Sequence, residues 1–107
     1  MNTEEKKAFN DFILERKYQA ECMRVTPNKS VEGFMWNWSG KVKINNPVII
    51  KDRIFTFAKV ELNGKIKFVH TSSFFDRFSN NQELIGEYEL ERVTSVCGVM
   101  YTLIPQD

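Results

Sequence analysis

The chain has 107 residues, of which 42% are hydrophobic and 27% are charged, and its formal net charge at pH 7 is +1. This length provides one domain with a single core and excludes a multidomain protein, while the balance of apolar and charged residues excludes an intrinsically disordered chain. No stretch resembles a signal peptide or is apolar enough to span a membrane, so we expect a cytoplasmic protein with no membrane partner.

Charge is distributed unevenly along the chain. Residues 1–39 carry six basic and six acidic side chains, residues 40–80 carry eight basic and three acidic ones, and residues 81–107 carry one basic and five acidic ones. A basic middle segment favours an anionic partner such as nucleic acid. The alternative is two ordinary solvated faces of opposite charge.

Residues 3–21 are predicted to form an amphipathic helix that Asn2 or Thr3 caps. Apolar residues recur at helical spacing on one stripe, namely Phe9, Phe12, Ile13 and Ala20. We expect this stripe to pack against the rest of the domain, and docking into a groove of a partner is the alternative. The Pro, Asn and Ser cluster at 26–30 ends the helical region. The single domain is therefore divided into an N-terminal helix and turn, residues 1–30, and a β-rich part, residues 31–107.

The β-rich part begins with a long predicted strand at 31–44. Phe34, Trp36 and Trp38 alternate along one side of it, and Lys41 and Lys43 follow behind Gly40. Because three large rings do not fit easily into a small core, we expect at least one tryptophan to be exposed. The alternative is that these rings form the surface on which the N-terminal helix lies.

A second strand is predicted at 53–62, where the two sides differ in character. Alternate residues from Ile54 to Leu62 form a regular apolar set that we expect to face the core. Phe55, Phe57 and Lys59 are on the other side, and we expect them to face outward, although a covering helix is the alternative. Asn63-Gly64 is a strong hairpin signal and leads into a third strand at 65–72. Residues 72–81 indicate a short helix or turn, and 83–93 and 97–104 indicate two further strands.

This order of elements resembles the OB-fold, a five-stranded Greek-key barrel with a short helix between strands three and four. The glycine inside the long first strand, Gly40, is similar to the bend with which that strand serves both sheets. Leu84-Ile85-Gly86 resembles the turn into strand four, and "GVMYTLI" resembles the closing strand. The resemblance covers residues 31–104 and implies a mainly β, five-stranded OB-like barrel with an additional N-terminal α-helix.

The basic and aromatic second and third strands resemble those of small single-stranded-DNA-binding proteins. This resemblance implies a non-enzymatic protein whose partner is single-stranded DNA or RNA. The chain ends at "TLIPQD" without the acidic flexible tail of bacterial single-strand binders. We therefore expect a specialised replication accessory, for example of a phage or mobile element, rather than a general genome-maintenance protein.

Single-stranded nucleic acid is held by stacking of bases on aromatic rings, at about 1–3 kcal/mol per base, and by cations that neutralise phosphates. Strands that alternate aromatic and basic side chains can supply both. The predicted nucleic-acid-binding residues are Trp36, Trp38, Lys41, Lys43, Arg53, Phe55, Phe57, Lys59, Lys65 and Lys67.

A protein-interaction module is the alternative function, because OB-folds are not confined to nucleic acids. In this reading the aromatic face or the N-terminal helix docks on, or inhibits, a polymerase, helicase or nuclease. The near-neutral net charge and the acidic C-terminal part favour it.

The remaining chemistry-bearing residues do not predict an enzyme, a metal site or a cofactor. Cys22 and Cys97 form no CxxC pair, and we interpret them as reduced thiols, with a disulfide as the alternative. The single histidine, His70, is expected to be half buried in a structural role. A row of carboxylates on the fourth strand is spaced about 7 Å apart in a line, which suits neither a metal nor an acid–base pair; these are Glu87, Glu89 and Glu91.

Overall fold

The computed structural model describes residues 2–25, 37–53 and 55–106. An N-terminal helix precedes seven strands and a 3-10 helix, η1, at Ser73–Arg77. The helix is α1 (Thr3–Val25) and the strands are β1 (Asn37–Asn45), β2 (Val48–Lys51), β3 (Thr56–Leu62), β4 (Lys65–Thr71), β5 (Gln82–Glu83), β6 (Glu87–Ser95) and β7 (Gly98–Ile104). The prediction of a mainly β domain behind an N-terminal helix is confirmed. In the segment 72–81, where a short helix or turn was expected, the structure has the 3-10 helix η1.

The start of α1 is stabilised by a reciprocal capping arrangement. The Glu5 N–H donates to Asn2 Oδ1 at 2.8 Å, and the Asn2 N–H donates to Glu5 Oε1 at 3.0 Å. Both bonds satisfy backbone N–H groups at a helix start, the pattern of a capping box. The cap is therefore Asn2, which is one of the two residues predicted for this role.

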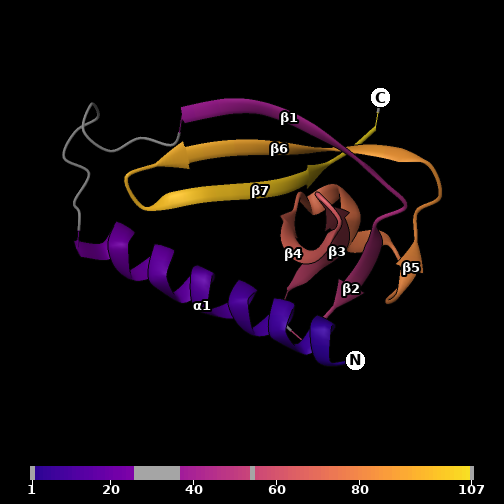
Figure 1. The fold of residues 1–107 in the computed structure, drawn as a ribbon. Coiled ribbons are helices and arrows are strands. Elements are labelled where there is room, and N and C mark those ends of the chain that lie inside the picture. Colours follow the sequence, from indigo (N-terminus) through magenta and orange to yellow (C-terminus); the bar gives the residue numbers. More distant parts are fainter. Residues whose placement is uncertain (1, 26–36, 54, 107) are drawn as a thin grey trace.

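All seven strands belong to one sheet with the order β1-β6-β7-β4-β3-β2-β5 (Figure 1). Every neighbouring pair is antiparallel except β4 and β7, which run parallel and pair only at His70–Thr102 and Thr71–Leu103. Within the described ranges the ladders do not close the sheet, and these ranges contain seven strands where five were expected for the chain. Strands β2 and β5 were not predicted from the sequence. Strand β2 is separated from β1 by Asn46, which has a φ of 49°, and by Pro47, which has no N–H for a ladder.

Two local signals in the sequence have the expected structural result. A register shift between Trp38 and Gly40 marks a β-bulge, with Gly40 at a φ of 129°, and a bulge bends its strand. Asn63 and Gly64 have φ values of 55° and 78° and connect β3 to β4. Positive φ at both central residues is what a tight hairpin turn of this kind requires.

The sheet buries side chains on both of its faces. The inner core confirms the predicted core face of β3 at Ala58 and Val60, whereas Ile54 lies outside the described residues. Helix α1 lies against the opposite face at β4 (Figure 1). There it contributes to a second cluster, which consists of Phe12, Phe57 and Phe68. The inner core consists of Ile44, Ile49, Ala58, Val60, Val69, Phe75, Leu84, Leu90 and Leu103.

Within the described part of the chain, no helix is both long enough and apolar enough to cross a membrane.

Candidate functional site

Helix α1 covers the aromatic face of β3 that was predicted to bind nucleic acid. Phe57 is only 2% exposed, and its ring centroid lies 5.5 Å from that of Phe9 and 5.6 Å from that of Phe12. Phe55 is half buried, with the Arg16 guanidinium 4.2 Å from its ring centroid. The expectation that Phe55 and Phe57 face outward is therefore wrong. The apolar stripe of α1 needs a surface to bury, and these rings provide it.

Two of the predicted phosphate-binding lysines form ion pairs with the same helix. Lys59 Nζ lies 2.7 Å from Glu5 Oε2, and Lys67 Nζ lies 3.6 Å from Glu15 Oε1. The hydrogen bond from Lys59, followed by the bond from the Asn2 backbone, lowers the pKa of Glu5 below its ordinary value. Both lysines thus hold α1 against the sheet.

Strand β1 presents the one predicted tryptophan that the structure describes. Trp38 is 62% exposed, so it is not covered by α1, while Trp36 lies outside the described residues. Lys41 and Lys43 pair across the strands with Glu89 and Glu87, each at 3.7 Å. The predicted acidic row therefore lies beside the lysines and reduces their attraction for phosphate.

The last two predicted residues, Arg53 and Lys65, are exposed. Neither forms an ion pair with another described residue. Arg53 follows β2 and Lys65 begins β4 at the hairpin turn. The nine described residues of this predicted set thus do not form one continuous surface, because four of them on the α1 side are covered or paired; these are Phe55, Phe57, Lys59 and Lys67.

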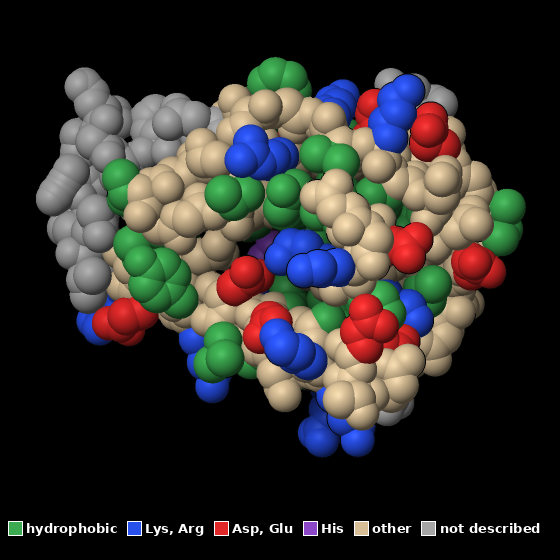
Figure 2. All heavy atoms as spheres, viewed as in Figure 1, with side chains coloured by type: hydrophobic (Ala, Val, Ile, Leu, Met, Phe, Trp, Pro, Cys, Tyr) green, Lys and Arg blue, Asp and Glu red, His purple; other side chains and the backbone are tan. Residues whose placement is uncertain are grey.

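An exposed apolar groove between α1 and β7 was missed by the reasoning from sequence. We call it the α1–β7 groove; it has a volume of about 520 Å³. Leu14 and Tyr18 are 62% and 64% exposed on the helix side, and Val99 is exposed on the strand side. Figure 2 shows hydrophobic side chains gathered between the positions that α1 and β7 take in Figure 1. The groove is lined by Leu14, Glu15, Tyr18, Gln19, Lys67, Cys97, Gly98, Val99 and Tyr101.

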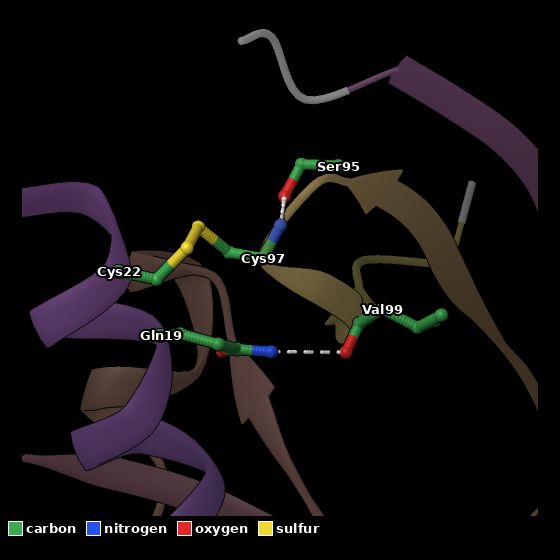
Figure 3. The surroundings of a disulfide bond; sticks show 5 residues. All are labelled: Gln19, Cys22, Ser95, Cys97 and Val99. Carbon is green, nitrogen blue, oxygen red and sulfur yellow. Dashed lines mark hydrogen bonds between the residues drawn. A yellow bond between two sulfur atoms is a disulfide. The ribbon is translucent and has the colours of Figure 1, made fainter. Parts of the chain in front are cut away.

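A disulfide between Cys22 of α1 and Cys97 of the β6–β7 turn joins the two walls of this groove (Figure 3). The prediction of reduced thiols is therefore wrong. The fold brings the two Cα atoms to 5.8 Å although the residues are 75 positions apart, a distance that suits a disulfide. Beside it, Gln19 Nε2 donates to the Val99 carbonyl oxygen at 3.1 Å, and the Cys97 N–H donates to Ser95 Oγ at 2.9 Å.

One sequence signal could have found the helix wall of the groove. Leu14, Tyr18 and Cys22 are spaced four residues apart, so they follow one another along a helix face. This second row lies beside the main stripe, which includes Phe9, Phe12 and Ile13. Ala20, which was assigned to the main stripe, is exposed.

His70 is half buried, as predicted, and its ring centroid lies 5.2 Å from that of Phe12. Burial, followed by repulsion from Arg16, lowers the pKa of His70 below its ordinary value of 6.5. The neutral imidazole therefore belongs to the packing beneath α1. No group of three or more metal-ligating side chains gathers anywhere in the described ranges.

Comparisons of this chain with family models, with curated proteins and with solved structures find no match.

Proposed function

We propose that this protein is a non-enzymatic protein-interaction module and that the α1–β7 groove is its contact surface. The observation that carries this proposal is the convergence of Leu14, Tyr18 and Val99, all exposed, on one groove. Scattered single apolar residues are ordinary on a protein surface, but apolar side chains gathered at one place mark interaction sites.

The disulfide gives the groove a property that favours binding. Cys22 and Cys97 tie the C-terminal part of α1 to the β6–β7 turn, so the two walls are held together before a partner arrives. A surface that is ordered in advance loses less conformational entropy on association. Disulfides persist in oxidising environments, so the bond counts against the cytoplasmic location that was expected.

We further propose that the architecture is OB-like. Strands β1 and β2 act as two parts of one long strand, with β6 as the neighbour of the first part and β3 as the neighbour of the second. Strands β4 and β7 pair in parallel, and η1 lies between β4 and β6. This order supports a partly open Greek-key barrel in which β3 and β4 are strands two and three.

The proposed OB-like architecture itself favours a protein partner over nucleic acid. The face of strands two and three is where OB-folds bind oligonucleotides, and here α1 covers that face through Phe57, Phe68 and the Lys59–Glu5 pair. Single-stranded nucleic acid is the second candidate, because Trp38 is exposed. Arg53 and Lys65 are also exposed and form no ion pair with another described residue, so they could contact phosphate. A polymerase, helicase or nuclease as the protein partner stays a prediction.

Quantitative pull-down from a lysate of the source organism tests the groove, with Leu14→Glu/Tyr18→Glu compared with the wild-type protein. Both side chains are more than half exposed, so the fold tolerates the new charges. Ile85→Glu is the matched control, because Ile85 is 73% exposed and does not line the groove. We expect the partner to bind wild-type protein and the Ile85 variant but not the groove variant. The same set of proteins on all three would overturn the proposal.

The second candidate is tested by titrating a labelled oligothymidine into wild-type protein and Trp38→Ala at rising salt concentrations. Single-strand binding predicts an affinity that falls with salt and falls again when Trp38 is removed. We expect no binding that depends on Trp38.

A further inference from the structure

One half of β7 has a free edge in the α1–β7 groove. Strand β6 pairs with β7 along its whole length, from Gly98 to Ile104. On its other side β7 pairs with β4 at Thr102 and Leu103, and the described residues supply no strand partner for Gly98–Tyr101. The free part is four residues, or about 13 Å of strand.

The backbone groups of this free part point into the groove. The Leu103 carbonyl on the β4 side accepts from the Ser72 N–H at 3.2 Å, and alternate residues of a strand direct their backbone groups to the same edge. The backbone groups of Val99 and Tyr101 therefore face the same side. Val99 and Tyr101 also line the groove, so main-chain hydrogen bonds and apolar side chains are available to a partner together.

The Gln19 side chain already forms a hydrogen bond with one of these backbone groups, as a neighbouring strand would. Its Nε2 donates to the Val99 carbonyl oxygen at 3.1 Å (Figure 3), which places a primary amide where the N–H of a neighbouring strand would lie. A side chain can rotate away, whereas a fixed strand of the sheet cannot. The edge is thus covered by a group that a peptide amide can replace.

We propose that the partner binds as an extended segment that adds a strand to the free edge of β7, displacing Gln19 from the Val99 carbonyl. This mode rests on the proposed function, since it uses the same groove. A free strand edge selects an extended main chain, and a groove beside it selects alternate side chains. Leu14 and Tyr18 line the helix side, so the segment carries apolar residues at alternate positions toward α1.

The test uses a displayed library of random linear peptides of about a dozen residues, long enough to cross the groove, selected against the oxidised full chain. The best binder is resynthesised with single N-methyl groups at successive positions. Strand addition predicts that N-methylation abolishes binding at alternate positions, because every second peptide N–H faces β7. Amide exchange by NMR should slow at least about tenfold at Val99 and Tyr101 on binding.

Two protein variants separate this inference from the proposed function. Gln19→Ala should bind the peptide at least as tightly as wild-type protein, because the Val99 carbonyl is already free. Leu14→Glu/Tyr18→Glu should not bind it, whereas Ile85→Glu should.

Each contrary result has a distinct meaning. Binding that needs Leu14 and Tyr18 but shows no alternation with N-methylation and no protection of Val99 and Tyr101 overturns strand addition and leaves groove binding in place. Binding that survives Leu14→Glu/Tyr18→Glu overturns both. Failure to select any peptide overturns strand addition, and the pull-down then tests whether the α1–β7 groove binds a protein partner.

Discussion

The Lys59 ammonium on β3 lies 2.7 Å from the Glu5 carboxylate in the first turn of α1. Residues 54 positions apart in the chain thereby connect the helix to the sheet beside the buried Phe57. The same carboxylate accepts the Asn2 N–H of the capping box. Lys59 was predicted from the sequence to contact phosphate, but in the structure it holds α1 against the sheet instead.

The Glu5 pair predicts a specific response to acid. The Lys59 hydrogen bond lowers the pKa of Glu5 from 4.5, so its contribution to stability is fully present above pH 4.5 and is lost as the pH falls through the lowered value. Glu5→Gln keeps the capping box but removes the charge. We expect it to be less stable than wild-type protein at neutral pH and to approach wild-type stability in strong acid. Urea unfolding at both pH values measures this, and Glu4→Gln, in the same turn, should leave the acid response unchanged.

Reduction of the Cys22–Cys97 disulfide should destabilise the protein by about 4 kcal/mol. A cross-link between residues 75 positions apart restricts a long loop of the unfolded chain, and the loop-entropy model gives this magnitude. The midpoint of guanidinium unfolding, measured with and without reductant, provides the test. Cys22→Ala/Cys97→Ala should match the reduced protein and should not respond to reductant. Equal midpoints for oxidised and reduced wild-type protein would contradict the prediction.

Phe57→Ala should cost about 3–5 kcal/mol of stability, the usual loss for a fully buried phenylalanine. Its ring is in contact range of Phe9, Phe12 and Phe68, so truncation leaves a cavity beneath α1. Trp38→Ala removes a larger ring that is 62% exposed, and we expect a change of less than about 0.5 kcal/mol. Urea unfolding of the two variants distinguishes a structural ring from a surface ring. A larger loss for Trp38→Ala would contradict the placement of α1.

His70 predicts a second pH effect on stability. Burial lowers the pKa of His70 from 6.5, so the unfolded chain binds more protons between the lowered value and pH 6.5. Stability should therefore fall as the pH drops through that window. Arg16, Glu15 and Lys67 line the same pocket as His70.

His70→Gln removes the titrating group and should flatten the stability profile between about pH 7.5 and 5.5. Thermal unfolding across this range measures the difference between the variant and wild-type protein. A variant with the same slope as wild-type protein would assign the pH dependence to other groups.

Local signals in the sequence were sufficient for several features. The capping box needs only Asn2 and Glu5 within one turn, and the β3–β4 hairpin needs only Asn63-Gly64 with positive φ at both residues. The core side of β3 follows from alternation, since Ala58 and Val60 are both buried. In each case the cause and its effect lie within a few residues of each other.

The tertiary structure alone decided what covers the second face of β3. Phe55 and Phe57 alternate with the core residues whether solvent, a ligand or a helix lies over them, so the pattern predicts a face and not its neighbour. It was the path of α1 that buried Phe57 and paired Lys59 with Glu5. The same packing brought Cys22 to Cys97 and Leu14 to the free edge of β7. Contacts between residues far apart in the chain depend on how whole elements pack, which residue spacing does not encode.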